Sequence, residues 1–149
     1  MVRIERTVRF RAPVHEVFDY VADFRTLKDY NPSIREVNLL TTGPPGEGSR
    51  FELKLSLPVG SIRTVLNITE FKKDALIATR LDAFVPAHEK RRFQPEGEET
   101  LFFFTIEFSS GWPIVGTLAD RLMARFFAEP QADTETRLLE QHFNRAPKG

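Results

Sequence analysis

The chain has 149 residues, with 21 Lys plus Arg and 21 Asp plus Glu, so its formal net charge is zero. This length suits one domain covering residues 1–149, and the balanced charge provides no basic surplus with which to bind nucleic acid. The absence of cysteine excludes disulfides, thiolate metal ligands and cysteine nucleophiles.

The amino terminus has no signal-peptide pattern. Its first ten residues, MVRIERTVRF, alternate charged and apolar side chains and contain no continuous apolar segment. No apolar run approaches the roughly 20 residues that a membrane-spanning helix requires. We therefore expect a cytoplasmic protein without integral membrane association.

The first predicted elements are one strand and two short helices. In residues 2–10, apolar side chains alternate with polar ones, as in a strand with one buried face. Ala12-Pro13 then opens a helix, because proline is tolerated at a first helical position. A second short helix is expected over residues 24–30, where Asn31-Pro32 ends it.

From Ile34 onward, apolar residues recur at every second position. This pattern predicts six further strands, over residues 34–42, 50–57, 61–71, 75–82, 87–94 and 100–109. The links between successive strands are short, which indicates an antiparallel meander.

The final part of the chain has helical periodicity. Residues 114–127 carry a wide apolar stripe that includes Leu118, Leu122 and Phe126. Pro130 is expected to kink or interrupt this helix, because proline removes a hydrogen bond and collides with the preceding turn. The expected fold class is therefore α+β, a curved seven-stranded antiparallel sheet wrapped around a long carboxyl-terminal helix.

The concave face of this sheet is expected to line a cavity beneath the helix. A mostly apolar cavity with a few hydroxyl groups is typical of a small-ligand pocket. The candidate ligand-binding residues from the sheet and helix are Phe51, Leu53, Leu55, Thr64, Leu66, Thr79, Leu81, Phe102, Phe104, Ile106, Leu118, Leu122 and Phe126. The alternative is that these side chains simply pack against one another.

The run of three phenylalanines at 102–104 requires one ring on the outer face of the sheet. With Phe102 and Phe104 pointing inward, Phe103 points outward. It is then either an exposed ring or part of a contact with another subunit, as in a homodimer.

The predicted strand over residues 87–94 is charged on both faces. If Phe93 points inward, Arg91 and Glu89 do so too, and they could hold one another or the polar head group of a ligand. With a bulge at the start of the strand, the inward set is instead His88, Lys90 and Arg92. A solvated edge strand is the remaining alternative.

Several segments resemble the SRPBCC, or START-like, superfamily. They are Ala12-Pro13, VFDYVAD at 17–23, YNPSIREV at 30–37, the glycine-containing loop at 43–49 with Arg50-Phe51, and RFQPEGEET at 92–100. The resemblance spans nearly the whole chain in the same element order. It implies a helix-grip fold with a hydrophobic cavity, in a superfamily that includes polyketide cyclases and dehydratases, lipid-transfer domains and ubiquinone-binding proteins. Such a fold does not determine the function.

The function expected first is binding of a hydrophobic small molecule, such as a lipid, an isoprenoid quinone or a polyketide. A polyketide cyclase or dehydratase is the enzymatic alternative. Tyr30, where superfamily members often place a cavity-mouth residue, and Arg91 are then the candidate catalytic residues, because a phenol or guanidinium can donate to a carbonyl oxygen. A protein-interaction module without a ligand is the third alternative.

No cofactor is expected, and neither is a metal site. The three histidines have no spacing typical of metal ligands on one helix or strand. They are His15, His88 and His142.

Overall fold

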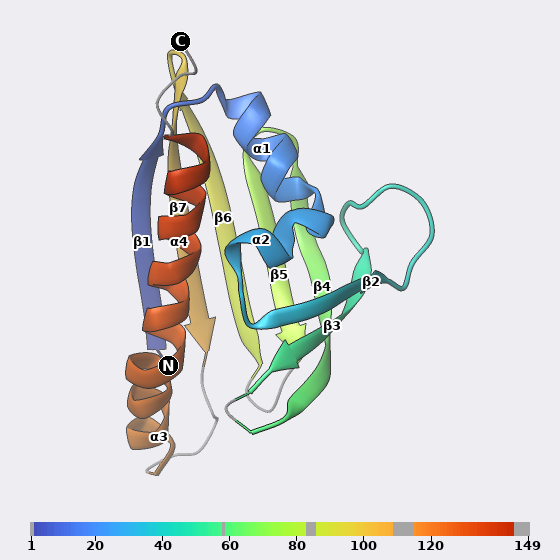
Figure 1. Cartoon of the computed structure of the whole chain (residues 1–149), viewed down its shortest axis with the longest axis vertical. Helices are drawn as coiled ribbons and strands as arrows, with labels where there is room; N and C mark the ends of the chain where they lie inside the picture. The colour runs from blue at the N-terminus through green and yellow to red at the C-terminus, as the bar shows by residue number, and fades with distance from the viewer. Residues whose placement is uncertain (1, 58, 83–85, 109–114, 145–149) are drawn as a thin grey trace.

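The computed structural model describes residues 2–57, 59–82, 86–108 and 115–144. Its strands form one antiparallel seven-stranded sheet in the order β1-β7-β6-β5-β4-β3-β2, which curves around the helices (Figure 1). The strands are β1 (Val2–Phe10), β2 (Ile34–Leu39), β3 (Arg50–Ser56), β4 (Ser61–Lys72), β5 (Leu76–Asp82), β6 (Ala87–Glu96) and β7 (Glu99–Phe108). The predicted meander is confirmed, since β2 to β7 pair in sequence order and β1 joins β7.

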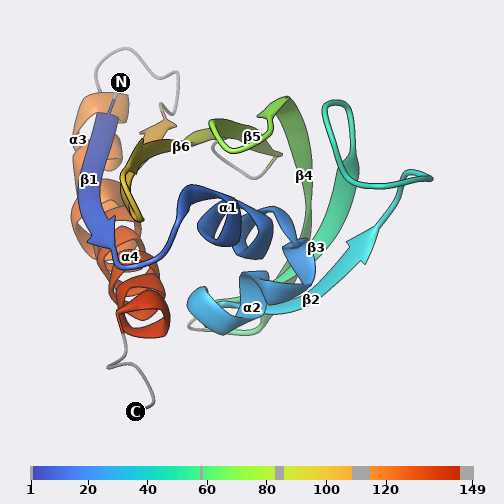
Figure 2. The ribbon, with the colours of Figure 1, turned by 90° about the horizontal axis from the view of Figure 1, so that it is seen from above.

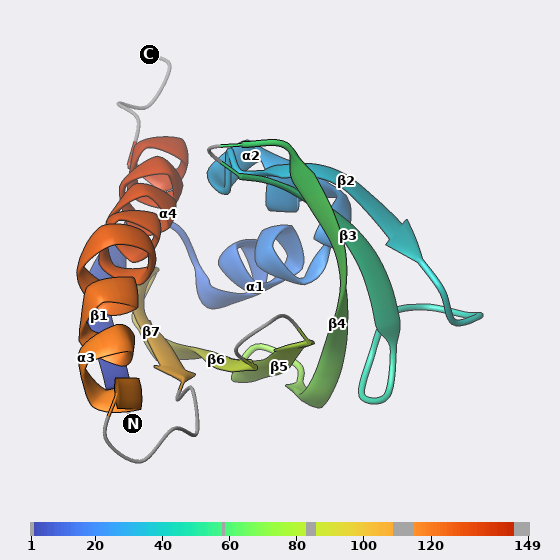
Figure 3. The same cartoon turned by 90° about the horizontal axis from the view of Figure 1, so that it is seen from below.

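The helices lie in two groups on the concave side of the sheet. The first group is α1 (Val14–Ala22), a 3-10 turn, η1 (Phe24–Thr26), and α2 (Leu27–Tyr30). The second group is α3 (Val115–Met123), a π-helical turn, η2 (Ala124–Ala128), and α4 (Glu129–Phe143). Figures 2 and 3 show α1 and α2 within the curve of the sheet and α3–α4 along β1. The predicted α+β helix-grip architecture is confirmed.

The first helix begins where the sequence predicts. Pro13 has an extended backbone, and its carbonyl accepts hydrogen bonds from the backbone N–H groups of Glu16 and Val17, at 3.0 and 3.2 Å. Val17, Phe18 and Val21 form the buried side of α1. The side of α1 on which the apolar residues recur therefore packs against the sheet.

Strand β7 shows why the alternating pattern predicts this sheet correctly. Phe102, Phe104, Ile106 and Phe108 are buried, and the residues between them are half-buried. Phe103 lies on the outer face, where the guanidinium carbon of Arg92 is 4.8 Å from its ring centroid. The outward ring is thus half-buried beneath a neighbouring side chain instead of being fully exposed.

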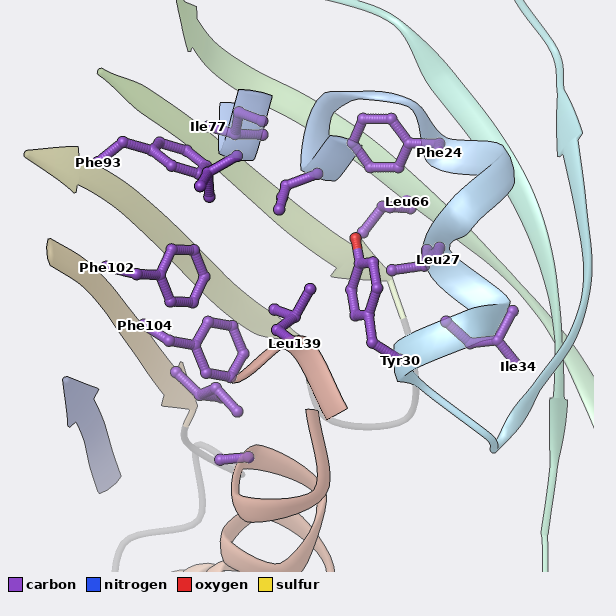
Figure 4. Close-up of a cluster of buried hydrophobic side chains, with 14 of the residues drawn as sticks. Phe24, Leu27, Tyr30, Ile34, Leu66, Ile77, Phe93, Phe102, Phe104 and Leu139 are labelled. Atoms are coloured by element: carbon purple, nitrogen blue, oxygen red, sulfur yellow. The ribbon is translucent and has the colours of Figure 1, made fainter. Parts of the chain in front are cut away.

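The core lies between the sheet and both helix groups. Figure 4 shows Phe102 and Phe104 of β7, Leu139 of α4 and Tyr30 of α2 pointing into the same interior. Ring contacts join β6, β7 and β1, because the Phe102 centroid lies 5.4 Å from that of Phe93 and 5.2 Å from that of Phe10. This aromatic packing fills much of the space beneath α4.

The expected orientation of the segment before Pro130 is wrong. Leu118, Leu122 and Phe126 are exposed, whereas Asp120 and Ala124 are buried. Ile114 lies outside the described residues, as does Ser109 at the end of the last predicted strand.

The π-helical turn explains this difference. The buried residues of α4 include Ala132 and Leu139, and an unbroken α-helical phase extended backward from them places Arg121 and Arg125 at the centre of the inner side, with Leu118 on its flank. A π-helical turn inserts one extra residue and so rotates everything before it. Pro130 accounts for the position of the turn, since it cannot donate to the carbonyl four residues earlier and collides with it.

Candidate functional site

A cavity of about 70 Å³ lies between the sheet, α1–α2 and α4. Its lining residues are Val21, Phe24, Leu27, Tyr30, Asn31, Ser33, Ile34, Leu53, Leu55, Leu66, Ile77, Leu81, Glu89, Arg91 and Gln131. Among these, Gln131 of α4 is exposed, so the cavity reaches the surface beside this helix. The volume holds a few water molecules and is well below the roughly 300–1,000 Å³ of most ligand pockets.

Larger hollows lie on the outside of the molecule. One of about 610 Å³ lies on the outer face of the sheet, and one of about 650 Å³ lies beside α1. The outer hollow is bordered by charged side chains such as Arg3, Lys90 and Glu107. We therefore place the candidate site in the small interior cavity, where polar groups are buried against apolar walls.

Arg91 is the centre of a buried ionic cluster at this cavity. Its Nη2 lies 2.9 and 3.1 Å from the two carboxylate oxygens of Glu135, and 3.1 Å from Oε2 of Glu89. Its guanidinium carbon is 4.6 Å from the Phe104 ring centroid. With both carboxylates ionised, two negative charges share one positive charge, and the cluster carries a net charge of −1.

Strand periodicity and the phase of α4 bring these charges together. In the β6–β7 register, Arg91 is opposite Phe104 and Phe93 is opposite Phe102. Arg91 and Phe93 are buried, so the first of the two predicted registers is the one found. Glu135 reaches Arg91 from α4, where it lies on the buried side with Ala132 and Leu139.

Burial changes the proton affinity of the groups in this site. The pKa of Glu135 is raised to about 7, chiefly by burial. Arg91 opposes this shift, and the nearby Glu89 adds to it. For Arg91, burial opposes the charged form, but Glu135 and Glu89 outweigh burial and raise the pKa. Burial raises the pKa of Tyr30, so its phenol stays protonated at neutral pH and can act as a donor.

Three buried side-chain polar atoms have no hydrogen-bond partner within the described residues. They are Nε of Arg91, Oγ1 of Thr79 and Oδ1 of Asp74, and of these residues only Arg91 lines the cavity. Unpaired buried polar groups are costly, and each calls for an explanation. Because Arg91 lines the cavity, an acceptor atom inside the cavity could complete its hydrogen bonding.

The structure brings together seven of the residues selected from the sequence. The cavity-lining members of that set are Tyr30, Leu53, Leu55, Leu66, Leu81, Glu89 and Arg91. The other inward-facing candidates are buried in the core but do not line the cavity, and they are Phe51, Thr64, Thr79, Phe93, Phe102, Phe104 and Ile106. Leu118, Leu122 and Phe126 are on the surface, as the π-helical turn requires.

Sequence reasoning missed two parts of the site. The first is the wall from α1, η1 and α2, where Val21, Phe24 and Leu27 close the cavity. Their helical apolar spacing could have identified them as inward-facing. The second is Glu135, whose spacing from Ala132 and Leu139 places it on the buried side of α4; a carboxylate among buried positions was the available signal.

The described residues offer no evident metal site or membrane-spanning segment. No group of three or more His, Cys, Asp or Glu side chains among them could hold a metal ion. No helix in the described ranges is long and apolar enough to cross a membrane.

Comparisons with known proteins agree with this architecture. A family model described as polyketide cyclase/dehydrase and lipid transport matches residues 1–142, whereas no curated protein matches the chain. A crystal structure of a protein from Thermus thermophilus aligns with a TM-score of 0.77 and 17% identity, covering 99% of this chain and 100% of that one.

Two further solved structures carry informative descriptions. The Zhui aromatase/cyclase from a Streptomyces species aligns with a TM-score of 0.75 and 17% identity, covering 97% of this chain and 94% of its own. A START superfamily protein from Mycobacterium smegmatis aligns with a TM-score of 0.75 and 19% identity, covering 96% of this chain and 97% of its own. At such identities the likeness is one of fold.

Proposed function

Because the chain belongs to the polyketide cyclase/dehydrase and lipid transport family, we propose that it binds a hydrophobic small molecule in the cavity beneath α4. Arg91 holds an oxygen of that molecule, such as the carbonyl or hydroxyl of a lipid, an isoprenoid quinone or a polyketide. The observation that supports this proposal is a buried guanidinium whose Nε has no partner among the described residues, at the wall of an otherwise mostly apolar cavity.

The cluster around Arg91 suits an anchoring role. Glu135 and Glu89 fix one nitrogen of the guanidinium, so the group is held in place before a ligand arrives. A small number of fixed polar groups in an apolar pocket orients a ligand and provides specificity. Holding the group in advance also reduces the ordering cost of binding.

The size of the cavity sets a condition on this function. At about 70 Å³, the cavity cannot enclose a lipid or a polyketide unless its walls separate. Leu55, Leu81 and Ser33 are half-buried lining residues, and Gln131 is exposed. We propose that the ligand enters between α2 and α4, where these less buried side chains yield more readily than the aromatic core.

A cavity-filling substitution tests this proposal. Displacement of a fluorescent fatty acid and mass spectrometry of gently purified protein would measure binding. Leu55→Trp should reduce binding about tenfold or more, because the ring occupies the cavity. Leu57→Trp is the matched control, since Leu57 follows the same strand but is exposed and does not line the cavity. Absence of binding across several ligand classes, or equal loss in both variants, would contradict the proposal.

Cyclase or dehydratase activity is a second candidate, favoured by the convergence of polar groups. Tyr30, Arg91 and Glu89 line the same cavity. In an aldol cyclisation, an enolate carbon attacks a carbonyl carbon, and the carbonyl oxygen takes a proton. A protonated phenol and a guanidinium are suitable groups to stabilise that oxygen and supply the proton.

Tyr30→Phe is the decisive variant for the enzymatic candidate, because it removes one hydroxyl and keeps the ring. With a poly-β-ketone substrate, turnover should fall on the order of a hundredfold or more while fatty-acid displacement persists. Tyr20→Phe is the control, since Tyr20 lies outside the cavity lining. Turnover unchanged by Tyr30→Phe would exclude the phenol as a proton donor.

A further inference from the structure

A row of exposed apolar side chains lies outside the cavity, on α3 and η2. Leu118 is 63% exposed, Leu122 48%, Phe126 63% and Phe127 56%. Leu118, Leu122 and Phe126 follow one another at intervals of four residues. Single exposed apolar residues are normal on a soluble protein, but a contiguous group of this kind indicates an interaction surface.

The fold keeps this row away from the core. Figure 1 shows α3 extending past the end of the sheet at which β1 begins and β7 ends. The π-helical turn orients α3 so that Asp120 and Ala124 lie on its inner side, where both are buried. The apolar row is consequently presented outward at one end of the molecule.

The exposed charges within residues 118–127 have one sign, and the next exposed acidic residue along the chain is Glu129, where α4 begins. Residues 118–127, all within the described ranges, contain two exposed charged side chains, Arg121 and Arg125. The acidic residue of this segment, Asp120, is buried. The guanidinium carbon of Arg125 is 5.9 Å from the Phe126 ring centroid, so cationic and apolar groups are adjacent.

We propose that α3 and η2 dock on an anionic lipid surface. Leucine and phenylalanine side chains beside arginines are suited to the boundary between head groups and acyl chains, where the rings and aliphatic chains insert and the cations meet phosphates. A symmetric contact with a second copy is less suitable, because it would bring the Arg121–Arg125 surface of each copy against an identical cationic surface. This docking does not depend on the cavity holding a ligand.

Vesicle sedimentation tests the proposal. The full chain should bind vesicles of phosphatidylglycerol and phosphatidylcholine and should bind pure phosphatidylcholine vesicles far more weakly. Arg121→Glu/Arg125→Glu and Leu122→Ser/Phe126→Ser should each lower partitioning to anionic vesicles about tenfold or more. All four positions are exposed, so the variants should retain the parent's circular dichroism and melting temperature.

Two controls separate this surface from general effects. Arg137→Glu removes an exposed cation from α4, and Leu40→Ser removes an exposed leucine from a different part of the surface; both should bind vesicles like the parent. Fatty-acid displacement should be unchanged in all these variants, which distinguishes loss of docking from loss of cavity binding. The proposal fails if the parent does not bind anionic vesicles, if the controls lose binding equally, or if light scattering shows a dimer that Leu122→Ser/Phe126→Ser dissociates.

Discussion

Arg91 of β6 and Glu135 of α4 form a buried ion pair between residues 44 positions apart in the sequence, with Nη2–carboxylate distances of 2.9 and 3.1 Å. This pair joins the sheet directly to the terminal helix. A buried carboxylate has few ways to avoid a large desolvation penalty. The pair therefore helps fix which side of α4 faces the sheet.

Removing the carboxylate of Glu135 should destabilise the protein. Glu135→Ala is expected to lower the free energy of unfolding by about 1.5–3 kcal/mol, because the buried guanidinium loses its two-oxygen hydrogen-bond partner and retains Glu89. Glu140→Ala, at an exposed position on the same helix, should change it by less than about 0.5 kcal/mol. Urea unfolding measures both, and similar losses would show that the ion pair contributes little.

The pKa of Glu135 also predicts how stability depends on pH. Because it rises from an ordinary value of 4.5 to about 7 on folding, the folded protein binds more protons than the unfolded chain between these values. The contribution of the Glu135 carboxyl to the free energy of unfolding is therefore fully present below about pH 4.5 and declines as pH increases toward 7. The residues that face this carboxyl are Arg91, Glu89 and Tyr30.

Comparison with Glu135→Gln isolates this effect. The free energy of unfolding, measured with urea from about pH 4.5 to about pH 7.5, should decline less steeply in the variant than in the parent. Asp23 and Asp82 have lowered pKa values, so their contributions are lost below the ordinary value of 3.8 and do not produce a decline in this window. Identical slopes in parent and variant would contradict the assignment.

Thr79 and Thr100 form a matched test of buried hydroxyl groups. Oγ1 of Thr79 has no partner within the described residues, whereas Oγ1 of Thr100 donates to the Ala12 carbonyl at 2.8 Å. Thr79→Val should raise the free energy of unfolding by about 1 kcal/mol, and Thr100→Val should lower it by about 1–3 kcal/mol. Thermal or urea unfolding compares the two. A loss in Thr79→Val would indicate that its hydroxyl is hydrogen-bonded in solution.

Pro130 should control the rotation of α3. Pro130→Ala restores a hydrogen-bond donor and removes the ring collision, so the π-helical turn is expected to relax to an α-helix. Relaxation removes one residue from the turn and rotates α3 by about 100°, which brings Leu118 and Leu122 toward the core together with Arg121 and Arg125. The same rotation brings Asp120 outward.

The absence of cysteine makes this rotation measurable with single thiols. Leu122→Cys should react quickly with a thiol reagent in the parent background and several times more slowly with Pro130→Ala. A thiol at position 140, beyond the π-helical turn, should react equally in both backgrounds. Unchanged reactivity at position 122 would show that another interaction holds the turn.

The sequence was most informative where a local pattern determines which face of the sheet a side chain occupies. Alternation along β7 predicts the burial of Phe102, Phe104 and Ile106, and the inward position of Phe93 predicts that of Arg91. These predictions succeed because a strand side chain can face only two ways.

The sequence was least informative about features that depend on how distant elements pack together. The side of α3 that faces the core depends on one additional residue in η2, and the apolar pattern of the sequence does not reveal such an insertion. The partner of Arg91 on α4, Glu135, was missed because no local rule pairs positions so distant in the chain. The volume of the cavity depends on how the rings and α1–α2 pack together.

Strand β1 pairs with β7 along its whole length, from Val2 opposite Phe108 to Phe10 opposite Thr100. On the ribosome, this first strand emerges long before its partner, while the hairpins between β2 and β7 can form in turn. The amino-terminal segment must therefore remain unpaired through most of translation, and its docking is a late, long-range closure. Charged side chains recur along β1, and they disfavour association of the unpaired strand with other nascent chains.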